Sequence, residues 1–258
     1  MNHGLPLNIL TFIFGACIGS FLNVCIYRIP AGLSIIHPGS SCPCCQQMIP
    51  FYDNLPILSY LMLRGKCRVC KTPIALRYPM VELLGGLSAL ACLAAFGPTV
   101  QAAVLFVFIA TLIVVTFIDL DHRIIPDAIS LPGIPVFFLA AFAVPTVTWH
   151  ASVVGIVAGG GSLFVVAWVY QLITGREGMG GGDIKLLAMI GAMVGWQGIL
   201  FTLFAASAIG TLVGLIAMVR SGKGLKLAIP FGPFLAMGAV SYLFLGEGLT
   251  AWYFNMLR

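Results

Sequence analysis

Charged side chains are scarce in this sequence. Only 8% of its 258 residues are Asp, Glu, Lys or Arg, whereas 60% are hydrophobic. A typical soluble domain is about half apolar and about a quarter charged, so this composition excludes an ordinary water-soluble domain. Several apolar runs approach the roughly 20 residues that a bilayer-spanning helix needs. The sequence therefore predicts an all-α polytopic membrane protein.

The basic n-region of a secretory signal is also lacking, because "MNHGLPLNIL" contains no Lys or Arg ahead of the first apolar run. We expect that run to be retained as a membrane helix. About eight spans are predicted from the apolar runs. They are 5–27, 79–97, 99–118, 128–146, 150–173, 184–197, 198–219 and 230–250. The sixth and seventh spans divide at "GWQG".

The net charge of +5 could suggest a nucleic-acid partner, but the positions of the basic residues indicate membrane topology instead. With eight spans and the N-terminus outside, every Lys and Arg except Arg258 falls in an inner loop. Lys and Arg gather in short cytoplasmic loops. We therefore predict that both termini lie outside and that no nucleic acid is bound. The polar insert at 28–78 and the segments "IDLDHRIIPD" and "GMGGGD" would then lie at the cytoplasmic face.

The polar insert contains two C-x-x-C pairs, one at Cys42 and Cys45 and one at Cys67 and Cys70. Four thiolates in this pattern match a structural tetrahedral zinc site. A set of disulfides is the weaker alternative, because the cytoplasm keeps thiols reduced. Since no open coordination position is implied, the metal is expected to brace the insert. Cys44 is a surplus thiol beside this site.

Three other cysteines, Cys17, Cys25 and Cys92, lie in apolar runs. Free cysteine in such a setting behaves as a small hydrophobic residue. We expect all three to be ordinary core residues.

Four of the eight acidic residues lie at predicted membrane edges: Asp119, Asp121, Asp127 and Asp183. Carboxylates at such places are functional candidates, because unpaired charge there is costly. Asp127 follows a proline and precedes an apolar run, which favours a helix cap. Asp121 is equally well explained as a solvated loop residue. Asp119 and Asp183 remain, the first at the end of a span and the second after three glycines.

Two neighbouring carboxylates suggest a particular chemistry. Such a pair tends to share one proton, so that one member acts as a base on water while the other polarises a carbonyl group. The glycines before Asp183 would let the backbone approach a substrate closely. Other catalysts are poorly supported, since no P-loop appears and the histidines lack an obvious nucleophile. "GIVAGGG" at 155–161 is better explained as a helix-packing stripe than as a nucleotide loop.

These residues and their order resemble the bacterial type IV prepilin peptidases, membrane aspartyl proteases of the GxGD class. The matching segments are "GSFLNVCIYRIP", the two cysteine pairs, "NLPILSYL", "RYPMVELL", "IDLDHRIIPD", "TGREGMGGGDIKLLAMIGAMVGW" and "IPFGPFLA". The resemblance covers nearly the whole chain. It implies that Asp119 and Asp183 are the catalytic pair. The implied substrates are prepilins and pseudopilins, which carry a short basic leader before a hydrophobic N-terminal helix.

The resemblance further implies location in the bacterial inner membrane and a second activity, N-methylation of the new N-terminus with S-adenosylmethionine. The cysteine insert is associated with that activity, so we expect the bifunctional form. The implied domains are a first transmembrane helix (1–27), a zinc-binding insert (28–78) and an aspartyl protease domain (79–258). No donor-binding residues emerge. The residues of the family-like segments that we would test for a role in methyl transfer are Asn54, Tyr60, Lys66 and Arg77.

Two other functions remain open. A transporter could use intramembrane acids as a proton or cation relay, but such acids normally lie near mid-bilayer. An assembly factor could use the insert for docking, and the loss of one aspartate of the pair would favour it. Both aspartates are present.

Overall fold

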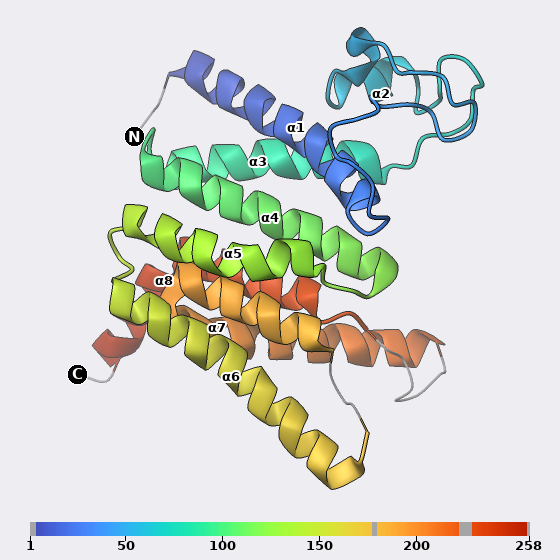
Figure 1. Ribbon diagram of the computed structural model, residues 1–258. Coiled ribbons are helices and arrows are strands. Elements are labelled where there is room, and N and C mark those ends of the chain that lie inside the picture. Colours follow the sequence, from blue (N-terminus) through green and yellow to red (C-terminus); the bar gives the residue numbers. More distant parts are fainter. Residues whose placement is uncertain (1–3, 177–179, 222–228, 257–258) are drawn as a thin grey trace. The chain divides into compact units, whose positions relative to one another are not determined.

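The described parts of this computed structural model are residues 4–176, 180–221 and 229–256, and their regular structure is helical apart from two isolated β-bridges (Figure 1). The elements in chain order are α1 (Leu5–Arg28), η1 (Phe51–Asn54), α2 (Leu58–Met62), α3 (Arg77–Phe96), α4 (Val100–His122), α5 (Asp127–Ala140), η2 (Ala141–Ala143), α6 (Trp149–Thr174), α7 (Gly181–Ser221) and α8 (Gly232–Met256). The chain forms two compact units, Met1–Val114 and Val115–Arg258.

Five of these helices, α1, α3, α4, α6 and α7, are long and apolar enough to cross a membrane, and two shorter apolar helices cover Asp127–Ala143 and Gly232–Gly246. The 41 residues of α7 would extend over about 60 Å at 1.5 Å per residue if they formed one straight helix. That is about twice the thickness of a bilayer core. Gly195, with φ 69° and ψ 179°, interrupts the helical backbone. Because this break falls in "GWQG", α7 accommodates the sixth and seventh predicted spans.

In the first unit, α1 and α3 pack with their backbones close together. A side-chain Cβ at Gly15 would lie 2.6 Å from the Gly85 carbonyl oxygen, and one at Gly19 would lie 2.7 Å from Glu82 Cα. Small residues permit such close helix packing in membranes. The buried Asn23 adds a polar link, donating from Nδ2 to the Tyr78 carbonyl at 3.1 Å. The cysteine insert leaves the end of α1 and returns at the start of α3.

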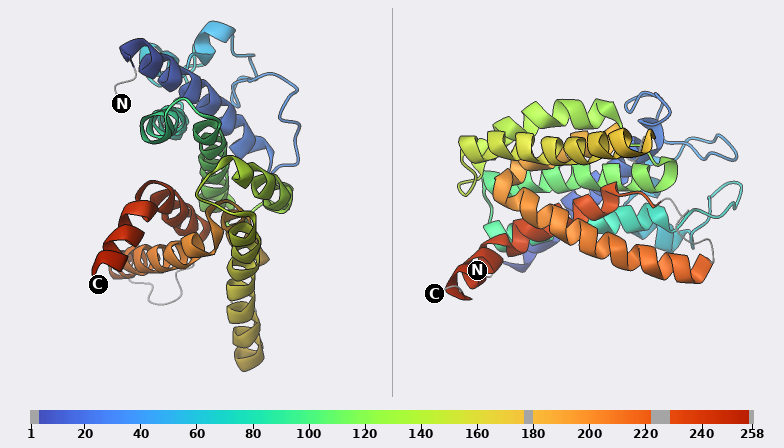
Figure 2. Two further views of the ribbon diagram at one scale, coloured as in Figure 1. Left: turned by 90° about the vertical axis from the view of Figure 1, so that its left-hand side faces the viewer. Right: turned by 90° about the horizontal axis from the view of Figure 1, so that it is seen from below.

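In the second unit, α7 packs against α5, α6 and α8 (Figures 1 and 2). Its first half forms the core of the unit, with fully buried Leu186, Leu187, Met189, Ile190 and Met193.

The interface between α6 and α7 depends on small residues. A Cβ at Gly159 would lie 2.5 Å from the Leu187 carbonyl oxygen, and Gly155 is equally close to the backbone at Gly191. Ser152 Oγ donates to the Ala192 carbonyl at 2.6 Å. These contacts confirm the helix-packing interpretation of "GIVAGGG".

Candidate active site and metal site

Asp119 lies one helical turn before the end of α4 and is 5% exposed. The helix continues past the predicted end of the span and closes at Arg123, whose N–H donates to the Asp119 carbonyl at 2.9 Å and whose φ is 55°. Asp121 is exposed, because helical residues two positions apart face different sides. Of the two aspartates in "DLD", Asp119 is therefore the one that faces the protein interior.

The first residue of α8 holds the Asp119 carboxylate. The Gly232 N–H donates to Asp119 Oδ2 at 3.0 Å in a buried position. A Cβ on residue 232 would lie only 2.7 Å from the same oxygen. The N-terminus of a helix carries partial positive charge and favours a carboxylate. The "PFGP" segment, noted in the sequence only for its resemblance, thus has a direct contact with Asp119.

Asp183 lies in the first turn of α7 and is half-buried. The Asp119 carboxylate acts electrostatically on Asp183, so the two side chains lie within range of each other's charge. Both residues belong to the second unit. The fold therefore brings together the two aspartates that the sequence analysis selected.

The glycines before Asp183 do not have one common role. Gly178 and Met179 lie outside the described residues. A Cβ at Gly182 would lie 2.9 Å from Ile125 Cβ, so this glycine lets the start of α7 pack against the loop that follows α4. A Cβ at Gly180 or Gly181 would meet no described atom within 4 Å. The open backbone at these two positions agrees with the close substrate approach expected there.

Asp127 is the first residue of α5, and the N-cap is Pro126, so the helix-cap interpretation of Asp127 is wrong. Its side chain forms an ion pair instead. Its Oδ1 accepts from Lys185 Nζ at 2.7 Å. Lys185 lies two residues after Asp183, so this pair joins the start of α5 to the start of α7. The sequence analysis did not foresee it, since the partners are 58 positions apart.

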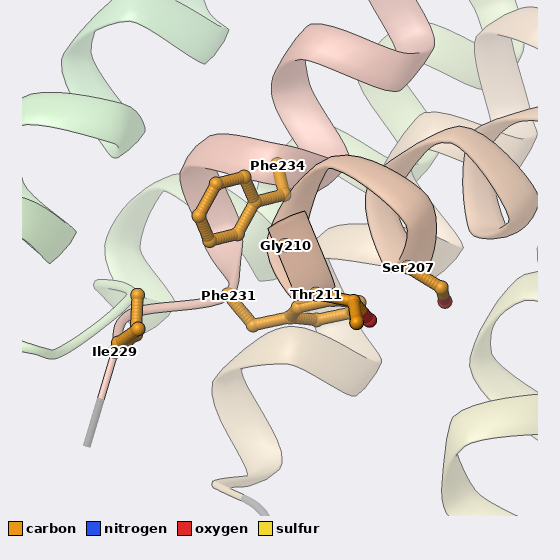
Figure 3. A pocket seen from close by; sticks show the side chains of 6 residues that line it. All are labelled: Ser207, Gly210, Thr211, Ile229, Phe231 and Phe234. Carbon is orange, nitrogen blue, oxygen red and sulfur yellow. The ribbon is translucent and has the colours of Figure 1, made fainter. Parts of the chain in front are cut away.

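The first turn of α8 also borders a groove of about 400 Å³ (Figure 3). Its lining comes from α7, from the segment just before α8 and from the first turn of α8: Ser207, Gly210, Thr211, Ile229, Phe231 and Phe234. Phe231 directly precedes Gly232, and Phe234 follows it by two residues. A largely apolar groove with two hydroxyl groups therefore adjoins the residue that holds Asp119.

The two cysteine pairs form matching knuckles in the first unit. The Cys42 N–H donates to the Gln47 carbonyl at 3.0 Å, and the Cys67 N–H donates to the Thr72 carbonyl at 2.9 Å. The isolated bridge between Ser41 and Met48 is matched by one between Lys66 and Pro73. Each of these residues in the second knuckle lies 25 positions after the equivalent residue of the first, as in 42 and 67 or 47 and 72. The sequence analysis missed this short repeat, whose visible signal is the duplicated C-x-x-C.

The four knuckle cysteines face one another. The Sγ atoms of Cys42, Cys45, Cys67 and Cys70 all lie within 4.8 Å of each other, and Cys42 and Cys70 are 3.7 Å apart. Four thiolates on a tetrahedral zinc, each about 2.3 Å from the metal, would be separated by about 3.8 Å. The cluster could hold a metal ion, and its donors suit zinc. Cys44 is exposed and lies outside the cluster.

The pKa values of two thiols in this cluster are shifted in opposite directions. Bonds from the Thr72 hydroxyl and backbone N–H lower the pKa of Cys70 to about 6. At Cys45 the Gln47 N–H lowers the pKa, but desolvation and the other three thiols outweigh it and raise the pKa to about 11. Metal ligands must be deprotonated, so metal binding would release protons from this cluster.

The insert is also tied to α3 through Glu82. Its Oε2 accepts from the Ile57 N–H at 2.7 Å. Ile57 has φ 62° and ψ −47°, and the Leu58 N–H donates to the Pro56 carbonyl across it. This is a γ-turn with positive φ, which is rare and strained for a β-branched residue. Glu82 therefore stabilises a strained turn at the start of α2.

The structure confirms some of the predictions made for the other cysteines and leaves the candidates for methyl transfer untested. Cys25 and Cys92 are buried as predicted, but Cys17 is exposed on α1, so its assignment to the core is wrong. The four residues chosen for the methyl-transfer site lie on four different parts of the first unit: Asn54 in η1, Tyr60 in α2, Lys66 in the second knuckle and Arg77 at the start of α3. Their role remains a prediction.

The fold and these sites define a multi-pass helical membrane protein with a four-cysteine insert and an aspartate pair at helix ends. The Bacterial Peptidase A24 N-terminal domain matches residues 13–96, and the Type IV leader peptidase family matches residues 106–215. The chain belongs to the type IV leader peptidase family.

Relatives match over almost the full length. A prepilin leader peptidase/N-methyltransferase of Aeromonas hydrophila is 36% identical over 98% of this chain and 96% of the relative. Proteins of the same name from Pseudomonas putida and Stutzerimonas stutzeri are 37% and 35% identical, over 94% and 100% of this chain and 92% and 97% of the relatives. No solved structure matches.

Proposed function

We propose that this protein removes the leader from type IV prepilins or pseudopilins and then N-methylates the new N-terminal residue. The observation that carries the proposal is the placement of Asp119 and Asp183 within charge-interaction range in the segment that matches the leader peptidase family. The relatives that match over nearly the whole chain are named for both activities.

In the proposed cleavage, the two aspartates share one proton, because like charges close together cannot both ionise readily. The ionised carboxylate takes a proton from water, and the resulting hydroxide attacks the scissile carbonyl carbon. The protonated carboxyl group donates to the carbonyl oxygen. The carboxyl group that took the proton from water then passes it to the peptide nitrogen as the C–N bond breaks. The carbonyl of the leader re-forms, the leader and the new amine leave, and no covalent link to the enzyme is made. The pair as a whole holds the proton, so its titration is shared.

The second activity needs S-adenosylmethionine, whose sulfonium supplies the methyl group for the new amine. We assign this activity to the first unit, since the leader peptidase match begins at residue 106 and leaves the cysteine insert outside it. Zinc held by Cys42, Cys45, Cys67 and Cys70 would brace the insert. The proposed domains remain 1–27, 28–78 and 79–258, for the first helix, the insert and the peptidase.

The proposed setting is the bacterial inner membrane, with the active site at the cytoplasmic face and both termini outside. The support is the distribution of Lys and Arg, which gather in cytoplasmic loops. Among these residues, Lys223, Lys226 and Arg258 lie outside the described residues. The membrane helices are then in permanent contact with the lipid bilayer, and we propose no nucleic-acid partner. The products would serve type IV pilus assembly, type II secretion or both.

The experiment uses purified protein in detergent with a prepilin and S-adenosylmethionine, followed by intact mass. Wild type is compared with Asp183→Asn. Loss of the leader plus the gain of one methyl group, for wild type alone, supports both activities. Leader loss without a methyl group removes the transferase from the proposal. An unchanged prepilin with folded wild-type protein overturns the proposal and favours the transporter or docking functions.

A further inference from the structure

The two aspartates of the proposed pair are held differently. Asp119 is almost fully buried and accepts a hydrogen bond from the backbone of another helix. Asp183 is half-buried and, among the described residues, accepts no hydrogen bond. One carboxylate is therefore fixed by the fold, whereas the other can adjust its side-chain rotamer.

The group that fixes Asp119 is a backbone N–H, and the residue that carries it has no side chain. Gly232 is the first residue of α8, so its N–H has no carbonyl partner within its own helix. It donates instead to Asp119 Oδ2 at 3.0 Å. This bond satisfies two buried groups, a free N–H at a helix start and a carboxylate oxygen.

Steric contact explains why residue 232 is glycine. A Cβ added there would lie 2.7 Å from Asp119 Oδ2 and 3.4 Å from Ile125 Cδ1. The first distance is below any normal contact, and Asp119 cannot move freely because it is buried. Any side chain at residue 232 would thus displace the carboxylate itself.

We propose that Gly232 is a positioning residue for the peptidase: it fixes Oδ2 of Asp119 and leaves Oδ1 as the oxygen that acts on water and faces the shared proton. This rests on the proposed function of the aspartate pair. Oδ2 is occupied by the Gly232 N–H, so the reacting oxygen of Asp119 is defined by the fold. Asp183, which lacks such a bond among the described residues, adjusts to the substrate and carries the other half of the proton transfer.

Two variants of residue 232 test the two parts of this contact. Gly232→Ala keeps the N–H and adds the Cβ. Replacement of Gly232 by glycolic acid, introduced in cell-free synthesis, changes the amide to an ester and removes the N–H without adding a side chain. Gly248→Ala is the matched control, because Gly248 lies on the same helix and an added Cβ there meets no described atom within 4 Å.

The readouts are kcat and KM for prepilin cleavage, together with methylation of a pilin that has already been cleaved. Gly232→Ala should lower kcat about 100-fold, since misplacement by an ångström costs about that much. The ester should lower kcat about ten- to hundredfold, through loss of a hydrogen bond to a charged group. KM should change by about twofold or less, as expected when only transition-state interactions are lost. Methylation and the Gly248→Ala variant should match wild type.

Wild-type kcat in either Gly232 variant would overturn the proposal. A parallel fall of cleavage and methylation in Gly232→Ala would indicate general damage to the fold, and the ester variant then decides, because it adds no atom that clashes. Failure of the proposed function looks different: the wild-type protein itself would leave the prepilin uncut. In that case no role in positioning remains for Gly232.

Discussion

The cysteine insert and the aspartate site are built in opposite ways. Each knuckle of the insert closes on itself through hydrogen bonds between residues five positions apart, Cys42 with Gln47 and Cys67 with Thr72. The aspartate site instead joins three distant segments, carrying Asp119, Asp183 and Gly232. A site made of local repeats can be read from spacing alone. A site made of distant segments depends on the packing of long helices, and its supporting groups stay hidden in the sequence.

This difference predicts that substitutions in the aspartate site impair cleavage, whereas substitutions in the cysteine insert impair methylation. The largest effect is expected for Asp119→Asn or Asp183→Asn. A general base or acid contributes about 10²- to 10⁴-fold, so each variant should lose cleavage by at least about 100-fold. Methylation of a pilin that has already lost its leader should continue. Mass spectrometry of the two reactions, run on separate substrates, makes this measurement.

Asp121→Asn is the matched control, because Asp121 lies two positions from Asp119 on the exposed side of α4. It should cleave within about threefold of wild type, as exposed substitutions away from a site usually have small effects. Normal cleavage by Asp119→Asn or Asp183→Asn would remove that residue from the proposed pair.

The next largest effect is expected in the insert. Cys67→Ser should lose the bound metal, measured by elemental analysis, because a structural site needs all four ligands. Methylation should then fall by more than about tenfold, since loss of support around a site commonly costs about 10- to 100-fold, whereas cleavage should fall much less. Cys44→Ser should behave as wild type, because Cys44 is exposed and outside the cluster. Equal loss of both activities in Cys67→Ser would mean that the metal supports the whole fold.

Glu82 connects the insert to the membrane helices, so a smaller effect is expected there. Glu82→Ala leaves the Ile57 N–H without an acceptor, which costs about 1–3 kcal/mol for a buried group. Glu82→Gln is the control, because its amide oxygen can still accept from Ile57. Limited trypsin digestion should cut the insert of the alanine variant fastest, and methylation should fall more than cleavage. Equal digestion of both variants and wild type would show that the strained turn does not depend on Glu82.

The sequence predicted the parts of the fold that depend on local pattern. The apolar runs gave the helices, and "GWQG" marked the break at Gly195. The spacing of Cys42, Cys45, Cys67 and Cys70 gave the cluster. The two aspartates could be selected because carboxylates are so rare in an apolar chain.

Contacts between distant segments could not be predicted in the same way. Nothing in "PFGP" indicates that the Gly232 N–H binds Asp119, a residue 113 positions away. The bond between Asp127 and Lys185 and the bond between Glu82 and Ile57 have the same origin. Each depends on how helices pack, which periodicity does not encode. A glycine or an acidic residue at a helix end can be recognised in the sequence as a candidate site residue. The distant residue that it contacts cannot.

The smallest expected effect concerns the ion pair between Asp53 and Arg68 on the insert surface. Arg68 Nε donates to Asp53 Oδ2 at 2.6 Å and NH2 donates to Oδ1, which makes the pair bidentate. The hydrogen bonds from Arg68, with its charge, hold the pKa of the Asp53 carboxyl below its usual range. A lowered pKa in the folded state stabilises the insert above the unfolded pKa of about 4, and this stabilisation is lost as the pH falls through the folded value.

At pH 7 the full contribution of the pair is therefore present. Although the Asp53 side chain is only 5% exposed, Arg68 is half exposed, and ion pairs that water reaches contribute little and are screened by salt. We expect Asp53→Asn to increase trypsin sensitivity of the insert less than Glu82→Ala does, with the difference from wild type shrinking in high salt. Arg68 is one residue from Cys67, so Asp53 is the safer member of the pair to change. An Asp53→Asn effect as large as that of Glu82→Ala, and independent of salt, would mean that this pair anchors the insert and that the buried bond to Ile57 does not.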